Sequence, residues 1–265
     1  MTVIAVGARP FYHEFAWAYD ALIARPVADE CAGIATWLAR RGVGPGAAVL
    51  DAGCGTGRYA VELARRGFAV TGIDRSFELL EEARSRARDA GLPITLVEAD
   101  LLDLPAAPGG RLHDAIVCRG VLNDMVGAAA RAAALGGFAR MLRPDGVVWL
   151  DVRDWSRTAA RKTVEPVTER RVATPRGSLA FQSVTRVDPA TRRLLLVSER
   201  HILTTSAGER VATHEFVMQC WTREELDAAL AAAGFEAIEH ADVGPGAPGK
   251  SFEDRLVATA SRSAR

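Results

Sequence analysis

Residues 49–60 read VLDAGCGTGRYA, in which a short apolar run is followed directly by three glycines at alternate positions. The run predicts a buried strand, and the segment RYAVELARRG (58–67) predicts a helix closed by its last glycine. The loop between them has two interpretations. As Gly-x-Gly-x-x-Ala (55–60) it fits the fingerprint that seats a dinucleotide pyrophosphate at a helix N-terminus. As Asp-x-Gly-x-Gly-x-Gly (51–57) it indicates a ligand without phosphate.

Predicted strands and helices alternate on both sides of this loop. The expected strands are 68–74, 94–100, 114–118 and 147–152, the expected helices are 27–41, 76–91, 127–142 and 222–234, and two last strands are expected at 235–243 and 254–262. Such alternation is the pattern of a parallel sheet with helices on both faces. We therefore predict an α/β fold with a single core.

The alternation of predicted strands and helices ends after Asp151, where long strand-like runs follow. Three runs, at 179–187, 192–204 and 209–219, are separated by short turn sequences and contain few glycines. We predict that residues 153–220 form an antiparallel β insertion. Because its strand edges would need covering, we expect the insertion to cover the substrate or to pair two subunits in a homodimer.

Composition excludes several classes of partner. The 265 residues carry 33 basic and 33 acidic side chains, so no excess of positive charge is available for a nucleic acid. The four cysteines contain no CxxC pair, which argues against a zinc site or a disulfide framework and favours the reducing cytoplasm. No stretch approaches the ~20 apolar residues that a membrane span needs. We therefore expect neither nucleic acid nor membrane as a partner, and no metal.

The glycine loop VLDAGCGTG, together with GID (72–74) and EADLLDLP (98–105), resembles the class I S-adenosylmethionine-dependent methyltransferases over roughly residues 45–152. This resemblance implies a Rossmann-like, doubly wound, seven-stranded and mostly parallel sheet with an antiparallel β insertion. The implied core comprises residues 1–152 and 221–265, of which 1–26 form a lid. It also implies that S-adenosyl-L-methionine is the cofactor.

The same resemblance assigns roles at the cofactor site. In the family, glycine-loop N–H groups face the methionine and ribose portions, an acid in the place of Asp74 accepts the ribose hydroxyls, and an acid in the place of Asp100 contacts the adenine amino group. The backbone N–H of Leu101 would meet the adenine ring. The cofactor-binding residues expected in this chain are Tyr19, Arg25, Asp51, Gly53, Gly55, Gly57, Asp74, Asp100, Leu101 and Cys118.

Other readings of these residues stay open. Taken singly, Asp74 and Asp100 would be solvated acids at strand ends, and a nicotinamide-dependent oxidoreductase also carries an acid in the place of Asp74. The ordered set of glycines and acids favours the methyltransferase, and no Tyr-x-x-x-Lys is recognisable in a chain with two lysines. A cofactor-binding module without transfer activity is the non-enzymatic alternative.

The N-terminal segment PFYHEFAWAYDALIARP (10–26) resembles the corresponding segment of small-molecule methyltransferases such as glycine N-methyltransferase and the amino-sugar N-methyltransferases, through Tyr12, Ala16, Tyr19 and Asp20. His13 departs from that pattern, which usually has Asp there. After the expected fourth strand, CRGVLNDM lacks the Asn/Asp-Pro-Pro-aromatic loop of enzymes that methylate DNA bases. We therefore expect a small metabolite methylated at nitrogen, with methylation at a hydroxyl oxygen as the alternative.

Candidate catalytic residues depend on the acceptor, because a neutral amine needs no strong base whereas a hydroxyl benefits from one. His13 and Asp124 are the principal candidates, and His214 is a third. Aromatic faces near the N-terminus could hold the sulfonium cation before transfer. The expected substrate-binding residues are Tyr12, Trp17, Arg119, Asn123, Arg153 and Trp155. Lone histidines are more often structural, which is the expectation for His113, His201 and His240.

Overall fold

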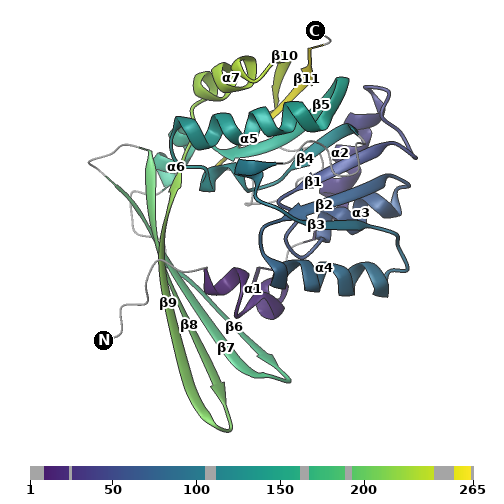
Figure 1. Cartoon of the computed structure of the whole chain (residues 1–265). Helices are drawn as coiled ribbons and strands as arrows, with labels where there is room; N and C mark the ends of the chain where they lie inside the picture. Colours follow the sequence, from purple (N-terminus) through teal and green to yellow (C-terminus); the bar gives the residue numbers. More distant parts are fainter. Residues whose placement is uncertain are drawn as a thin grey trace.

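The protein is described by a computed structural model that covers residues 9–23, 26–104, 112–161, 167–188, 193–241 and 254–263. It contains a seven-stranded sheet in the order β10-β11-β5-β4-β1-β2-β3 and a separate four-stranded sheet in the order β6-β7-β8-β9 (Figure 1). The strands of the large sheet are β1 (Ala48–Ala52), β2 (Ala69–Asp74), β3 (Thr95–Glu98), β4 (His113–Cys118), β5 (Leu142–Arg153), β10 (Phe235–Ala241) and β11 (Arg255–Arg262).

The large sheet is parallel except at β11. Strand β1 pairs in parallel with β2 and β4, β2 with β3, and β4 with β5, whereas β11 runs antiparallel to both β5 and β10. The predicted α/β fold with a mostly parallel seven-stranded sheet is thus confirmed. Between β4 and β5 the register jumps from His113↔Leu142 to Ala115↔Val147, which marks an irregularity at residues 143–146 of β5. Asp145 there has a positive φ of 62°.

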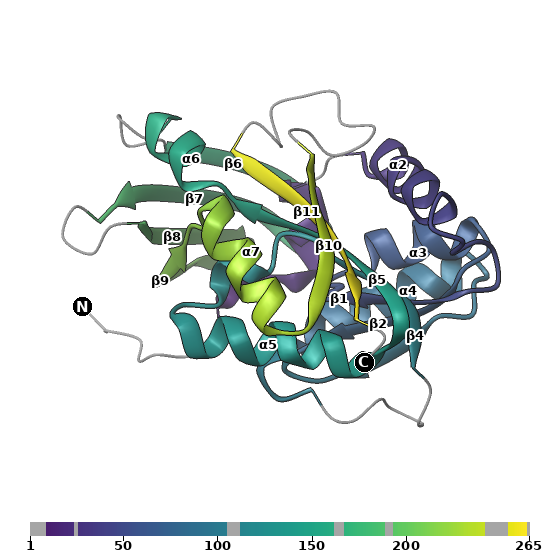
Figure 2. The same ribbon diagram turned by 90° about the horizontal axis from the view of Figure 1, so that it is seen from above.

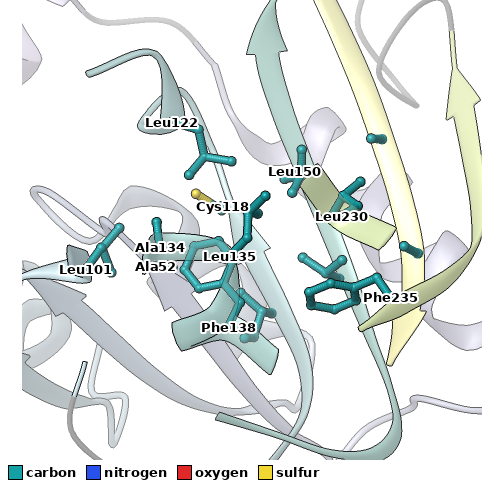
Figure 3. Packing of buried hydrophobic residues seen from close by; sticks show 14 of the residues in the cluster. Ala52, Leu101, Cys118, Leu122, Ala134, Leu135, Phe138, Leu150, Leu230 and Phe235 are labelled. Carbon is teal, nitrogen blue, oxygen red and sulfur yellow. The ribbon is translucent and has the colours of Figure 1, made fainter. Parts of the chain in front are cut away.

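Helices cover both faces of the large sheet (Figure 2). On one face lie α2 (Ala28–Ala39), α3 (Arg58–Arg65) and α4 (Phe77–Asp89), and on the other lie α5 (Ala128–Met141) and α7 (Arg223–Ala232). Neighbouring strand residues alternate between the two cores, so Val49 packs with Ile34 and Trp149, while Leu50 packs with Phe138. Figure 3 shows the second of these cores, in which α5 and Phe235 meet the sheet.

Three helices of the large domain begin at identifiable cap residues. Helix α4 starts at Ser76, whose hydroxyl accepts the backbone N–H of Leu79, and α7 starts with a capping box between Thr222 and Glu225. Helix α3 starts directly at Gly57, which has a left-handed φ of 72°. The cap residues therefore set where each of these helices begins.

The four-stranded sheet forms the antiparallel insertion, with β6 (Val167–Thr174), β7 (Gly177–Val187), β8 (Leu194–Thr205) and β9 (Gly208–Gln219). Three of its strands follow the expected runs, and β6 is an additional strand that the sequence did not indicate. Short helix α6 (Trp155–Arg161) leads from β5 into the insertion.

The N-terminal segment lies against the inner face of this insertion sheet. It contains the turns η1 (Pro10–Tyr12) and η2 (Ala16–Ala18) and helix α1 (Tyr19–Ile23), which lies between the insertion and α4 in Figure 1. Phe11 and Phe15 are fully buried and pack with Leu179 and Phe181 of β7. The segment therefore has its own apolar core with the insertion, distinct from the two cores of the large sheet.

Candidate active site

A cleft opens at the carboxyl ends of the parallel strands, where ligands bind in open α/β sheets. Its wall consists of residues that follow β1, β2, β3 and β4, and Tyr12 and Tyr19 of the N-terminal segment lie across it. We call it the inner cleft. Among the residues predicted to bind the cofactor, it brings together Tyr19, Gly53, Asp74, Asp100 and Leu101.

The glycine loop needs its glycines for two physical reasons. Gly53, Gly55 and Gly57 all have positive φ, at 75°, 53° and 72°, a region that side chains disfavour. A Cβ on Gly53 would in addition lie 2.4 Å from Cγ2 of Val121, and one on Gly57 would lie 2.9 Å from Cβ of Ala83. Only Gly53 borders the inner cleft. The other two glycines shape the turn into α3 behind it.

Asp74, the last residue of β2, connects the glycine loop to α4. Its Oδ2 accepts the Gly55 N–H and its Oδ1 accepts the Ser76 N–H, each at 2.9 Å. Burial raises the pKa of this carboxyl, and the two backbone N–H groups oppose that shift. A carboxylate held in this way on the cleft wall can accept hydrogen bonds from the hydroxyl groups of a ligand without moving.

Asp100 lies beside Asp74 because β3 pairs in parallel with β2, with Glu98 opposite Asp74. The side chain of Asp100 caps the turn η3 (Leu101–Asp103), since Oδ1 accepts the Leu102 N–H at 2.9 Å. Asp100 and Leu101 both border the inner cleft. The cleft thus has two carboxylates on adjacent strand ends.

Asp51 and Cys118 lie behind the wall of the inner cleft rather than in its lining. Burial raises the pKa of Asp51 to about 7, although the carboxylate accepts the backbone N–H of Ala60 in the first turn of α3. Burial likewise raises the pKa of the Cys118 thiol. Asp51 therefore contacts the first turn of α3 behind the glycine loop, and Cys118 packs in the core of the large sheet. Arg25, also predicted to bind the cofactor, falls outside the described residues.

A second cavity, which we call the outer cleft, lies between the N-terminal segment, β2 and the insertion sheet. Its lining includes Arg9, His13, His214 and Phe216, and it shares Tyr12, Arg75 and Asp124 with the inner cleft. The shared residues place the two cavities next to each other. A ligand in the inner cleft would therefore face a second ligand beneath the insertion.

Asp124 lies at the junction of the two clefts, in the turn η5 (Leu122–Asp124). Burial raises the pKa of its carboxyl, while the nearby guanidinium groups of Arg9 and Arg75 favour the charged form. At this point the Asp124 carboxyl could accept a hydrogen bond from the nitrogen or oxygen atom of an acceptor, or take a proton from it as a weak base. His13, the other candidate base, lies at the outer cleft, with Nδ1 2.7 Å from Oε2 of Glu78.

Arg119 borders the inner cleft, but its guanidinium is bonded to two buried carboxylates. Its Nε donates to Glu30 at 2.7 Å and its Nη1 donates to Asp151 at 2.6 Å, and only 7% of the side chain is exposed. Glu30 also accepts the Tyr59 hydroxyl at 2.7 Å. These contacts give Arg119 a part in the core beneath the cleft, so its charge is already compensated there.

The structure does not bring the other predicted substrate-binding residues into the lining of either cleft. Trp17 donates its indole N–H to the Glu14 carbonyl at 3.1 Å, and Asn123 accepts the Arg153 backbone N–H at 2.6 Å. Arg153 forms an ion pair with Asp254. Trp155 begins α6, and its backbone N–H donates to the Trp221 carbonyl at 2.8 Å. Each of these four residues has a structural partner where it lies.

Sequence reasoning missed several residues of the outer cleft, namely Arg9, Arg75 and Phe216. Arg75 could have been found, because it directly follows Asp74 at a strand end. Arg9 and Phe216 meet only because the N-terminal segment lies on β9, and no spacing in the sequence reveals that contact. In the described residues, no group of three or more His, Cys, Asp and Glu side chains could hold a metal ion. None of the helices described is both long and apolar enough to cross a membrane.

Comparison with known proteins finds similarity to methyltransferases in part of the chain. A family model described as "Methyltransferase domain" matches residues 49–146. The chain is 34% identical over 104 residues to a ubiquinone biosynthesis O-methyltransferase of Salmonella paratyphi A, covering 39% of this chain and 41% of the relative. It is 36% identical over 113 residues to an S-adenosyl-L-methionine-dependent Diels-Alderase of Talaromyces variabilis, covering 42% and 36%. The chain thus matches less than half the length of these two relatives.

Solved structures resemble the chain over nearly its whole length. The sugar N-methyltransferase KedS8 from Streptoalloteichus sp. is similar with a TM-score of 0.78 at 20% identity, covering 99% of this chain and 97% of that one. CalS10, an amino pentose methyltransferase from Micromonospora echinaspora crystallised with S-adenosylmethionine, is similar with a TM-score of 0.68 at 25% identity, covering 97% and 100%. Residues 49–146 therefore match the model of a methyltransferase domain, and the chain has the fold of the S-adenosylmethionine-dependent methyltransferases.

Proposed function

We propose that the protein transfers a methyl group from S-adenosylmethionine to an amine nitrogen of a small metabolite. The observation that carries this proposal is the adjacency of the inner and outer clefts, with Asp74 and Asp100 in the inner cleft and Asp124 in the lining of both. The solved sugar N-methyltransferase and amino pentose methyltransferase share the fold that builds this space.

The inner cleft fits S-adenosylmethionine better than a dinucleotide. Asp74 would accept hydrogen bonds from the ribose hydroxyls, and Asp100 would accept one from the adenine amino group. The cleft wall at Gly53, which has no side chain, would leave room for the methionine portion. A pyrophosphate would need the N-terminus of α3, yet Gly55 and Gly57 do not border the cleft. S-adenosylmethionine supplies an activated methyl group on a sulfonium, so these residues have only to bind and orient it.

The acceptor would lie in the outer cleft with its nitrogen beside Asp124. A carboxylate there can hold an ammonium group in place, and the raised pKa of Asp124 suits it to take a proton as the amine becomes neutral. Burial also raises the pKa values of Tyr12 and Tyr19, so both phenols stay neutral and offer aromatic faces to a cation. In-line transfer would then depend mainly on how closely the two ligands are aligned where the clefts adjoin.

Methylation at nitrogen is favoured over methylation at oxygen because the similarity to the amino-group enzymes extends over the insertion. The sugar N-methyltransferase and the amino pentose methyltransferase cover 99% and 97% of this chain, including the insertion that closes the outer cleft. The O-methyltransferase similarity covers 39% of the chain. The insertion, which would contact an acceptor, is thus matched in fold by the amino-group enzymes.

The test is a mass-resolved search for a product gaining CH2 when purified protein and S-adenosylmethionine are supplied to cell extract and to panels of amino and hydroxyl metabolites. A product methylated at an amine nitrogen supports the proposal. A product methylated only at oxygen would instead favour an O-methyltransferase. Calorimetry with S-adenosylhomocysteine and with NADH provides a second readout. Binding of NADH alone would overturn the cofactor assignment. Binding of S-adenosylhomocysteine without any product would favour a non-catalytic module.

We further propose that the protein works in the cytoplasm and forms a homodimer through the insertion sheet. The four cysteines are free thiols and are all buried, which suits a reducing compartment. The outer face of the insertion sheet carries exposed apolar side chains, among them Leu196 and Val211, which a second copy would cover.

A further inference from the structure

Tyr12 is held from two sides at the junction of the inner and outer clefts. Its backbone carbonyl accepts the hydroxyl of Ser76, which follows β2 in the large sheet. Its phenol oxygen accepts a hydrogen bond from Nη1 of Arg9. Because Tyr12 borders both clefts, the position of its hydroxyl affects the space in which cofactor and acceptor would meet.

Arg9 is itself fixed by the insertion sheet. Its Nε donates to Oε2 of Glu199 at 2.8 Å and its Nη2 donates to Oε1, so the pair is bidentate. The guanidinium carbon lies 4.3 Å from the centre of the Tyr12 ring and 4.1 Å from that of Phe216. Only 15% of the Arg9 side chain and 1% of the Glu199 side chain are exposed. The arginine therefore has little freedom to move.

Glu199 lies on the inner face of β8, and within the described part of the chain its ion pair is with Arg9. Across the neighbouring strands it faces Ser183 and His214, and two residues along β8 lies His201. His201 packs among Phe11, Phe15 and Phe181, and burial lowers its pKa to about 4, so it is neutral near pH 7. Arg9 is thus the partner that compensates the buried Glu199 carboxylate.

We propose that Glu199 is a positioning residue: through Arg9 it fixes the hydroxyl of Tyr12 at the junction of the inner and outer clefts. The insertion thereby sets the geometry of the transfer site as well as covering it. The arginine donates to the phenol oxygen, which leaves the phenol proton directed to other acceptors, including a ligand or Asp124. The functional part of this inference rests on the proposed methyltransferase, whereas the contact chain itself does not.

A second ion pair supplies a matched control. Glu14, also in the N-terminal segment, lies 2.5 Å from Arg210 of β9 and so links the same two elements. This pair is exposed, with 62% of Arg210 and 38% of Glu14 accessible, and neither residue borders the inner or outer cleft. Glu14→Gln therefore weakens the attachment of the segment without touching Tyr12.

The first experiment observes Tyr12 without any ligand. The chain has three tyrosines, so carbon-13 labelling at the tyrosine ring carbon bonded to oxygen gives three signals in the NMR spectrum, and Tyr12→Phe identifies one of them. Glu199→Gln should shift the Tyr12 signal, while Glu14→Gln should leave it in place. Glu199→Asp keeps the charge and should move the signal back towards its original position. An unmoved Tyr12 signal in Glu199→Gln would overturn the proposal.

The second experiment uses S-adenosylhomocysteine as the probe in calorimetry on the full chain. Tyr12→Phe and Glu199→Gln should each weaken binding by up to about tenfold, the size of one lost hydrogen bond. The double variant should bind no more weakly than Tyr12→Phe alone, because both changes remove the same interaction. Additive losses would mean that Glu199 acts through stability only, and would overturn the inference. If the unchanged protein does not bind the probe, the proposed function fails and the tyrosine signal alone decides on Glu199.

Discussion

Asp74 shows how one side chain can both build a site and serve it. Its two oxygens already hold the Gly55 and Ser76 N–H groups, so the carboxylate is fixed before a ligand arrives. Replacing Asp74 by Ala should weaken S-adenosylhomocysteine binding by about 1.5 to 3 kcal/mol, the range for hydrogen bonds to a charged group. Calorimetry measures this, with Asp103→Ala as the control because Asp103 is exposed in the neighbouring turn outside the cleft lining. Equal affinity in Asp74→Ala and the unchanged protein would remove Asp74 from the cofactor site.

Asp51 should make the stability of the protein depend on pH in an unusual direction. Its pKa is raised to about 7 by burial, and its Oδ2 has no hydrogen-bond partner among the described residues. In the unfolded chain the carboxyl titrates near 3.9, so the folded state binds this proton more tightly. The contribution is therefore fully present below about pH 4 and is lost as the pH rises to about 7, by at most about 4 kcal/mol.

Denaturant unfolding of Asp51→Asn and of the unchanged protein at several values between pH 4 and pH 8 tests this expectation. The asparagine does not titrate, so the variant should gain stability relative to the unchanged protein as the pH rises. Curves that stay parallel over this range would show that Asp51 does not keep a raised pKa in the folded protein.

The residues that could be read from the sequence are those whose roles depend on local spacing. Gly53, Asp74 and Asp100 follow strands of a parallel sheet, and the carboxyl ends of such strands meet at one edge. Arg9 and Glu199 are 190 residues apart and meet only after the insertion folds over the N-terminal segment. No pattern within either segment indicates that contact, which is why the outer half of the site escaped prediction.

At the scale of elements, helix α1 is tied to the glycine loop by Asp20. Its Oδ1 accepts the Thr56 hydroxyl at 2.9 Å, and its carboxylate pairs with Arg86 of α4 and lies 3.7 Å from Arg58 of α3. These groups are partly exposed, so solvent screening limits each pair to about 1 kcal/mol or less. Asp20→Asn should therefore leave the fold intact but loosen the N-terminal segment over the cleft.

Hydrogen–deuterium exchange measures that loosening. We expect amides of residues 9–23 to exchange faster in Asp20→Asn, while those of β1 and β4 do not change, because the large sheet does not depend on the contact. Glu81→Gln is the control, since Glu81 forms an exposed pair with Arg84 within α4. Exchange in 9–23 that matches the control would mean that Asp20 does not hold the segment.

Strand β6 shows why one element of the insertion was missed. Its eight residues VTERRVAT are mostly exposed and contain no apolar run or clear alternation. The strand forms because every residue from Val167 to Thr174 pairs with β7, which the sequence of β6 alone does not encode. By contrast, β8 alternates buried and exposed positions along most of its length, so its pattern was readable.

At the scale of the whole molecule, the insertion sheet uses its two faces differently. Its inner face carries Phe181, Glu199 and His201, which contact the N-terminal segment. Its outer face carries Leu196 and Val211, which are 41% and 43% exposed in the single chain. An exposed sheet face with apolar positions favours pairing with another sheet, and a second copy of the same chain offers an identical surface.

The homodimer can be tested by changing this outer face alone. Leu196→Lys combined with Val211→Lys should convert the dimer to a monomer, because two buried charges per copy would oppose association. Light scattering coupled to size-exclusion chromatography measures the mass, and Leu112→Lys, at an exposed apolar residue beside β4 in the large sheet, should leave the dimer intact. S-adenosylhomocysteine binding should persist in the double variant, since neither residue borders the inner or outer cleft. An unchanged protein that remains a monomer at high concentration would exclude the proposed dimer. A double variant that remains a dimer would move the interface to another surface, and the insertion would then act only on the transfer site that it covers.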